Sequence, residues 1–282
     1  MKNNSKFELY FWLKIAATCV FLGRAWQHLF VDAPYRALIW DEKIMKYFIE
    51  NVTSLTWHQF VTSADIDGDI QFFVKVIGGL FLLAAAAVWV LPHRLSQLIV
   101  ALGFSFLVLL AWLYFKENFY QWGQFWEYSL QICPSLLLLL FATQKADFQT
   151  IERKKNTVTY LKWATAITFF CHGLFAVGYY PRPGEWVQMG MNFLRISEPQ
   201  AAWLLYQFGV ADFIFCFLLL ATPFQKISLL YFIFWGFVTT FSRLYANFHF
   251  AFWQDFVWQW TPEFLYRVPH FLIPWVIWKQ KE

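Results

Sequence analysis

Apolar stretches of about 20 residues recur along this chain, and each is long enough to cross a hydrocarbon core as a helix. No other feature constrains the fold as strongly. The chain is 59% hydrophobic and only 14% charged, a balance that a soluble globular domain does not have. Because backbone polar groups must be satisfied internally in lipid, these stretches predict transmembrane helices. We expect eight spans, at residues 9–30, 71–91, 95–115, 125–143, 162–180, 201–222, 227–248 and 264–278.

Basic residues fall mainly on one side of these predicted spans. They lie in the N-terminus, in the turns after the second and sixth spans, in the segment 144–161 and in the tail, whereas acids match or exceed bases in the opposite loops. Basic loops stay in the cytoplasm. The sequence therefore predicts a multi-pass protein of a cell membrane, with a bacterial inner membrane as the expected location and both termini cytoplasmic. The lipid bilayer is an expected partner, and no nucleic-acid-binding pattern is present.

The basic segment 144–161 divides the chain into two halves, in which prolines, turns and amphipathic segments recur in the same order. Alignment of the two first spans places Arg24 opposite His172. In each half a Pro-containing turn and a Trp-bearing amphipathic segment follow the first span, and a proline ends the second span on the cytoplasmic side. We therefore expect two tandem four-helix bundles, residues 1–143 and 162–282, joined by a basic cytoplasmic linker.

Two segments between the predicted spans mix aromatic and charged residues. Residues 33–62 contain YRALIWDEKIMKYFIENV, which has the pattern of an interfacial amphipathic helix, and residues 182–196 are their counterpart. Either segment caps its bundle or offers a docking surface to a protein partner. Local signals also predict helix starts. Ser197 begins a capping box with a proline in the first turn, and Asp69, after a turn at 65–69, is expected to cap the second span.

Ionisable residues inside the predicted spans are the candidates for chemistry, because a charge in hydrocarbon costs about 3 kcal/mol or more. The deepest are Arg24, His172 and Asp212, and Arg243 lies in the seventh span. A histidine exchanges protons near neutral pH, so His172 suits quinone reduction if Asp212 or Arg243 orients it. We predict His172, Asp212 and Arg243 as catalytic candidates. Glu127 opens the fourth span and is expected near the outer surface.

A second group of residues is assigned to a substrate or quinone pocket. Arg24 and His28 are four residues apart and share a helix face, as do Glu263 and Arg267, with His270 following. The alternative is that opposite charges pair inside the bundle and fix helix register, or that Glu263 and Arg267 are interface anchors. The six histidines lack metal-ligand spacing, so no metal site is predicted. The four cysteines are interpreted as packing residues.

The second half resembles the DoxX-like membrane family, whose unit is a four-helix bundle. That family has a His-Gly pair in its first helix and Gly-x-x-acid in its second. Here the stretch FFCHGLFAVGYY carries His172 and Gly173, and the stretch FGVADFIFCFLLLATP carries Gly209 and Asp212, where glutamate is usual. In the first half Arg24, followed by alanine, replaces the pair, so the resemblance there is fainter.

The resemblance implies a quinone-linked oxidoreductase subunit or a redox-associated membrane component. Some members of the family are subunits of thiosulfate:quinone oxidoreductases, and others assist the maturation of redox proteins. A quinone is then the expected cofactor, and a protein complex the expected setting. Two other classes fit the sequence: a non-enzymatic anchoring or assembly subunit that binds a partner through its outer loops and, less closely, a small-molecule transporter. The residues leave open whether the chain is an enzyme.

Overall fold

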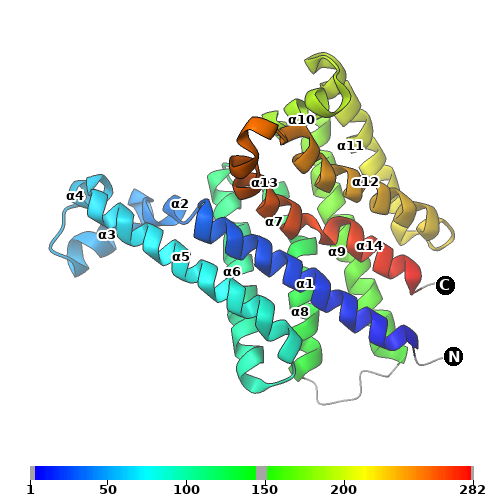
Figure 1. Ribbon diagram of the computed structural model, residues 1–282, viewed down its shortest axis with the longest axis horizontal. Coiled ribbons are helices and arrows are strands. Elements are labelled where there is room, and N and C mark those ends of the chain that lie inside the picture. Colours follow the sequence, from blue (N-terminus) through cyan, green and yellow to red (C-terminus); the bar gives the residue numbers. More distant parts are fainter. Residues whose placement is uncertain (1–3, 144–150, 281–282) are drawn as a thin grey trace.

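A computed structural model describes residues 4–143 and 151–280, and these ranges are helical with no strand (Figure 1). Three short 3-10 turns, Val88–Val90, Thr222–Phe224 and Phe250–Phe252, adjoin the α-helices. The α-helices are α1 (Asn4–Phe30), α2 (Arg36–Ile39), α3 (Glu42–Val52), α4 (Trp57–Thr62), α5 (Ala64–Ala87), α6 (Arg94–Glu117), α7 (Trp122–Trp126), α8 (Ser129–Thr143), α9 (Ile151–Val177), α10 (Gly184–Leu194), α11 (Glu198–Leu220), α12 (Gln225–Asn247), α13 (Trp253–Arg267) and α14 (Pro269–Lys279).

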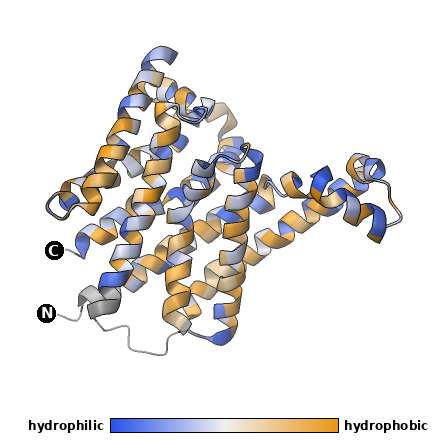
Figure 2. Ribbon diagram, turned by 180° about the vertical axis from the view of Figure 1, so that it is seen from behind, coloured by the Kyte–Doolittle hydropathy of each residue, from blue (hydrophilic) through white to orange (hydrophobic). Residues whose placement is uncertain are grey.

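Four helical stretches in the described ranges are long and apolar enough to cross a membrane. They are Ala64–Val90, Arg94–Glu117, Glu198–Leu220 and Gln225–Asn247. Hydrophobic residues cover much of the bundle helices, whereas hydrophilic residues gather in the turns and around α3 and α4 (Figure 2). The chain is therefore an all-helical protein with the character of a membrane protein, and these four stretches match the second, third, sixth and seventh predicted spans.

The other four predicted spans coincide with helices of different lengths. Helices α1 and α9 each have 27 residues, about 40 Å, but they carry more polar residues. Helix α8 has only 15 residues and begins at Ser129, because the separate short helix α7 occupies the start of the stretch expected at 125–143. The stretch expected at 264–278 is divided at Val268 between α13 and α14.

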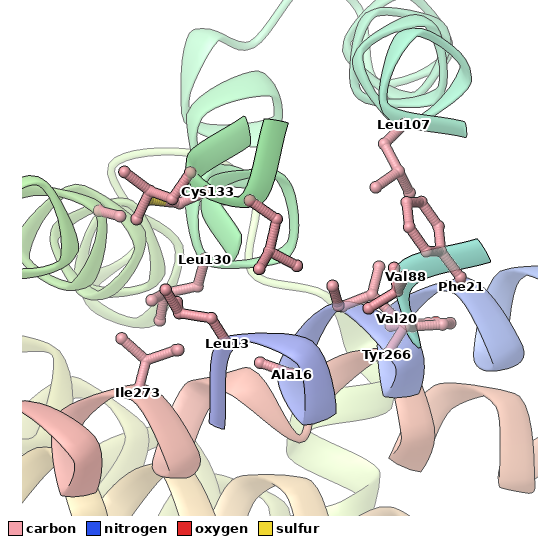
Figure 3. Close-up of a cluster of buried hydrophobic side chains, with 14 of the residues drawn as sticks. Leu13, Ala16, Val20, Phe21, Val88, Leu107, Leu130, Cys133, Tyr266 and Ile273 are labelled. Carbon is pink, nitrogen blue, oxygen red and sulfur yellow. The ribbon is translucent and has the colours of Figure 1, made fainter. Parts of the chain in front are cut away.

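The long helices pack in two groups. In the first group α1 packs against α5 and α8, and α6 packs against the same two helices; in the second, α9 and α12 each pack against α11 and α14. A continuous hydrophobic core runs through both groups. In Figure 3, Leu13 of α1, Leu130 of α8 and Ile273 of α14 lie together where the groups meet. Helix α1 is thus covered by helices from both halves of the chain.

Glycines bring helices into close contact both within and between the groups. A Cβ atom on Gly23 of α1 would lie 2.7 Å from the backbone nitrogen of Tyr266 in α13. On α12, a Cβ atom on Gly236 would lie 2.5 Å from the backbone oxygen of His270. Such distances leave no room for a side chain. These glycines therefore set the spacing of the helices that carry Arg24, Arg243 and the α13–α14 junction.

The outer segment 33–62 differs from the single amphipathic helix that the sequence predicts. It forms α2, α3 and α4, which project away from the bundle in both views (Figures 1 and 2). The break falls at Asp41, whose side chain accepts hydrogen bonds from the backbone N–H groups of Lys43 and Ile44 and so caps α3. A short polar residue at this position competes for the backbone and ends α2.

Two local expectations about helix starts have different outcomes. The capping box at Ser197 is confirmed, with Gln200 accepting a hydrogen bond of 3.0 Å from the Ser197 backbone. The prediction for Asp69 is wrong: α5 already begins at Ala64, and the Ser63 side chain caps it. Residues 65–69 are helical rather than a turn, because the cap precedes them. Of the expected linker 144–161, residues 144–150 lie outside the described ranges, and residues 151–161 form the start of α9.

Candidate functional site

A cavity of about 510 Å³ lies in the second half of the chain, enclosed by α9, α10, α11, α12 and α13. Its walls are mostly apolar, and that volume is in the usual range for a small-molecule site. The ionisable side chains on its wall are His172, Asp212, Arg243 and Arg267. The cavity therefore brings together all three predicted catalytic candidates and one residue of the predicted pocket group.

His172 lies on α9 at the wall of this cavity and is only 8% exposed. Its Nε2 atom is buried and has no hydrogen-bond partner, and the nearest carboxylate oxygen, Oε2 of Glu127, lies 3.8 Å away. The His270 ring stacks on it with the centroids 5.4 Å apart, and the edge of Trp186 approaches at 5.8 Å. The packed rings hold the imidazole in place while one ring nitrogen stays free for a further hydrogen bond.

Glu127 is the acid beside His172, and its depth in the membrane stays a prediction. It is buried, at 8% exposure, between α7 and α8. Its Oε1 atom accepts a hydrogen bond of 2.7 Å from Gln124, and its backbone carbonyl accepts one from Thr168 of α9. The first half of the chain thus supplies the carboxylate that faces the histidine of the second half. The aligned sequence could not show this contact, because it joins positions 45 residues apart on different helices.

Asp212 accepts its hydrogen bond from a residue other than His172. It is 1% exposed, and its Oδ1 atom accepts a hydrogen bond of 2.8 Å from the hydroxyl of Tyr231. Tyr231 also stacks on Phe215, so the Asp212–Tyr231 pair is fixed between α11 and α12. Asp212 therefore adds a polar group to one wall of the cavity. The acid beside the imidazole of His172 is Glu127.

Two arginines lie on the same wall of the cavity but differ in their partners. Arg243 of α12 donates to Oε2 of Glu263 at 3.0 Å and to the backbone carbonyl of Thr239. This ion pair agrees with the alternative that buried charges fix helix register. Arg267 of α13 forms neither an ion pair nor a side-chain hydrogen bond with any residue of the described ranges, and its Nε atom is buried without a partner. Arg267 is thus the charged side chain that the fold leaves open.

The remaining residues of the predicted pocket group lie off the cavity wall. Glu263 is held by Arg243, and His270 lies behind His172, with its Nδ1 atom 3.0 Å from the Arg267 carbonyl oxygen. His28 contacts the backbone oxygen of Arg24 at 2.6 Å and the hydroxyl of Tyr35 at 3.1 Å. Both ring nitrogens of His28 are therefore occupied inside the first half.

Arg24 is fully buried at the contact between the two halves. Its guanidinium donates to Oε1 of Gln27 at 2.7 Å and to Oε1 of Gln131 at 2.6 Å, and its Cζ atom lies 3.8 Å from the ring centroid of Tyr266. The rings of Tyr114 and Tyr128 complete its surroundings. This environment of amide oxygens and aromatic faces stabilises a cation without a carboxylate. Arg24 joins α1, α8 and α13 and has no place at the cavity.

Helix α10 contributes much of the cavity wall, and sequence patterns assign no role to most of its residues. Trp186, Met189, Phe193 and Leu194 line the cavity from this helix. Trp186 lies in the first turn of α10, within the predicted amphipathic segment 182–196. The recurrence of apolar residues at helical spacing in 182–196 was the available signal. This spacing predicts an amphipathic helix, but it does not show which part of the protein the apolar face of that helix contacts.

A second cavity, of about 410 Å³, lies on the other side of α9. It is lined by aromatic and aliphatic side chains together with Cys171 and Cys216, and no charged side chain of the described ranges reaches its wall. All four cysteines of the chain are unpaired. The first cavity, with its histidine, two arginines and carboxylate, is therefore the one equipped to bind and orient a polar group.

Comparisons of this chain with protein-family models, with curated proteins and with solved structures find no match.

Proposed function

We propose that this chain is a DoxX-like membrane protein of two tandem four-helix units, with eight spans and cytoplasmic termini, and that the cavity of its second unit binds a quinone. It would act as a quinone-linked subunit or redox-associated component of a bacterial inner-membrane complex. The single observation that carries the binding function is a mostly apolar cavity whose wall carries both His172, with one ring nitrogen not hydrogen-bonded, and Arg267, whose side chain has no direct partner in the described ranges.

The duplication is supported by the pattern of helix contacts. The contacts of α1 with α5 and α8 correspond to those of α9 with α11 and α14. The contacts between the units are also reciprocal, since α1 packs on α13 and α14 while α9 packs on α7 and α8. Two copies related in this way place Arg24 and His172 at equivalent points of one interface. The start of α1 and the end of α14 also lie on the same side of the molecule in Figure 1, in agreement with an even number of spans.

The residues at the cavity fit the chemistry of a quinone headgroup. A quinone has two carbonyl oxygens that accept hydrogen bonds on an apolar ring, and when bound it accepts electrons and protons. Arg267 and Arg243 are donors for a carbonyl oxygen, and the apolar residues of α10 and α11 suit the ring and tail. His172, with Glu127 at 3.8 Å, would hold and exchange a proton. The electrons would come from a protein partner.

Replacement of His172 tests this proposal. We expect His172→Gln to lower quinone-dependent electron transfer in native membranes by about 100-fold, the lower end of the usual contribution of a general acid. Bound quinone, measured by extraction from the purified protein, should change much less. His58→Gln alters an exposed histidine of α4 and serves as the control. Unchanged electron transfer in His172→Gln would exclude the proton-exchange role, and a wild-type protein that neither carries nor binds quinone would exclude the site.

A second candidate function, partner binding without catalysis, is favoured by the projecting outer helices. Tyr47, Phe48 and Val52 of α3 are more than half exposed, at 80%, 51% and 64%. Aromatic residues on an exposed helix are typical of interface anchors. The double variant Tyr47→Ser, Phe48→Ser should release a stoichiometric partner from the protein purified out of native membranes. Retention of the partner, or purification of the wild-type chain alone, would contradict this function.

A further inference from the structure

The cavity has a cation on its wall, Arg267, that forms no ion pair or side-chain hydrogen bond within the described ranges. Other arginines and lysines with buried or partly buried side chains have carboxylate or amide partners, among them Arg24, Arg36, Lys116, Lys162 and Arg243. Arg267 differs from them, because its guanidinium has no hydrogen-bond or ion-pair partner in the described ranges. Its nearest aromatic face, that of Tyr266, lies 5.9 Å from Cζ. A charge in mostly apolar surroundings is costly when no group bonds to it, so a partly buried guanidinium without a partner on a cavity wall indicates a ligand group that meets it.

The acids around Arg267 are committed to other groups. Glu263 accepts a hydrogen bond from Arg243 at 3.0 Å, and Glu127 accepts one from Gln124 at 2.7 Å and faces His172. Both carboxylates act on Arg267 electrostatically, yet neither forms an ion pair with it, and neither lines the cavity. Asp212 does line the cavity and is bonded to Tyr231. A molecule in the cavity therefore meets Arg267 on the wall, and no acid of the described ranges holds that side chain in a direct ion pair.

The surroundings of Arg267 strengthen its attraction for a negative charge. Most of the wall around it is aliphatic or aromatic, so little water screens the interaction and the effective dielectric constant is low. A planar guanidinium also binds two oxygen atoms at once, a geometry that an ionised headgroup with adjacent oxygens satisfies. A neutral carbonyl oxygen accepts the same hydrogen bonds but lacks the attraction between opposite charges.

We propose that the cavity selects an acidic quinone in its ionised form, with the anionic oxygen at Arg267 and the apolar ring and tail along α10 and α11. This inference rests on the proposed quinone function and adds the charge of the ligand to it. The chemistry that would be recognised is a ring hydroxyl that is ionised at neutral pH, beside a ring carbonyl. An ether of the same ring has the same shape but no charge, and it should bind less tightly.

Binding of a matched pair of probes tests the inference. We would titrate the purified full-length protein in nanodiscs with an alkyl-substituted 2-hydroxy-1,4-naphthoquinone and with its 2-methoxy ether, and measure both dissociation constants by quenching of tryptophan fluorescence. The ionised hydroxyquinone should bind at least about tenfold more tightly, the ratio that a charge-assisted hydrogen bond contributes at its lower limit. Arg267→Gln should reduce the ratio to near one by weakening the hydroxyquinone alone, and Arg267→Lys should keep most of it.

Two further arms separate the possible outcomes. Arg195→Gln removes an exposed arginine at the end of α10 that does not line the cavity, and it should leave the ratio unchanged. Equal binding of the two probes to wild-type protein would overturn the inference and leave quinone binding intact. Failure of both probes, with a fatty acid bound more tightly than its methyl ester, would support anion selection and exclude the quinone. Failure of all four ligands would overturn both proposals.

Discussion

Individual residues of this protein divide into those that complete the fold and those left open at the cavity. Arg24 and His172 occupy equivalent positions in the two aligned halves, yet their surroundings differ. Arg24 is enclosed by Gln27, Gln131 and tyrosine rings, whereas His172 keeps a free nitrogen beside Glu127. Within the described ranges Arg24 has one buried nitrogen without a partner, its Nε, but both of its terminal nitrogens donate to amide oxygens and it does not line the cavity, whereas His172 does. We therefore assign Arg24 a structural role.

The role of Arg24 is tested through its partner Gln131. Gln131→Leu keeps the side-chain size but leaves a buried guanidinium donor unmet, which should lower the free energy of unfolding by about 2 kcal/mol or more. Thermal unfolding in detergent would measure this loss. Gln207→Leu, at an exposed position of α11, should stay within about 0.5 kcal/mol of wild type. Wild-type stability of Gln131→Leu combined with lost quinone binding would instead place Arg24 in the functional site.

Asp41 provides a pH-dependent contact at the base of the projecting helices. Its carboxylate caps α3 and pairs with Lys116, and the hydrogen bond from Lys116 lowers the pKa of Asp41 below its ordinary value of 3.8. Because the folded pKa is the lower one, the stabilisation is complete above that ordinary value and is lost as the pH falls through the lowered pKa. We expect α3 to loosen only in strong acid.

A spin label on Tyr47→Cys would follow the mobility of α3 as a function of pH. The label should stay immobile at neutral pH and become mobile below about pH 3.8, the ordinary value of the Asp41 carboxyl. Adding Asp41→Asn should make it mobile at every pH, whereas Glu42→Gln, which affects only an exposed pair with Lys46, should preserve the transition. A transition that survives in Asp41→Asn would show that another acid controls it.

At the scale of helices, close packing at glycines decides how the cavity walls are spaced. Gly236 of α12 contacts the backbone of His270, while Gly79 of α5 has no atom within 4 Å of the position of its Cβ. The same substitution therefore has opposite consequences at the two positions. At Gly236 it forces α12 and α14 apart, and at Gly79 it only restricts the unfolded chain.

Gly236→Ala should lower the free energy of unfolding by about 1–3 kcal/mol, the usual effect of overpacking. It should also weaken quinone binding, because Arg243 lies two turns further along α12. Gly79→Ala should be neutral or stabilise the protein by up to about 1 kcal/mol. Thermal unfolding of both variants in the same detergent gives the comparison, and equal effects of the two substitutions would contradict the close approach of α12 to α14.

At the scale of the whole molecule, the two halves share one core. Helix α1 packs on α13 and α14, and α9 packs on α7 and α8, so each half covers a surface of the other. The buried contacts Arg24–Tyr266 and Glu127–His172 cross the same interface. The halves are therefore not independent bundles on a linker, although each has its own group of four packed helices.

Separate expression of residues 1–143 and 144–282 tests this coupling. We expect each fragment alone to aggregate or to bind no quinone, because its side of the shared core and a buried arginine or histidine would be uncovered. Co-expression should restore a stable one-to-one complex and part of the binding. Size-exclusion chromatography in detergent would report assembly. A monodisperse second half that binds quinone as tightly as the full chain would show that Glu127 is dispensable.

Much of the architecture could be predicted from the sequence, because it depends on local patterns. The apolar stretches indicate helices and their approximate lengths, and the capping box at Ser197 fixes one boundary. Local patterns fail at two other boundaries, because Ser63 caps α5 ahead of Asp69 and because Asp41 caps a new helix inside the segment predicted as one amphipathic helix. Of the candidate site, His172, Asp212, Arg243 and Arg267 were identifiable as costly charges in apolar surroundings. Sequence spacing alone could not show which of these face the same space.

Local patterns in the amino-acid sequence are enough to indicate that this chain is helical and rich in apolar stretches of membrane-spanning length. They also show that prolines, turns and amphipathic segments recur in the same order in its two halves. Three features depend instead on packing in three dimensions: Glu127 meets His172, tyrosines enclose Arg24, and Arg267 stays open at a cavity closed by α10. The physical reason is the same in each case. The rotation of a helix about its own axis, and hence which side chain faces which neighbour, is set by packing against other helices rather than by local pattern.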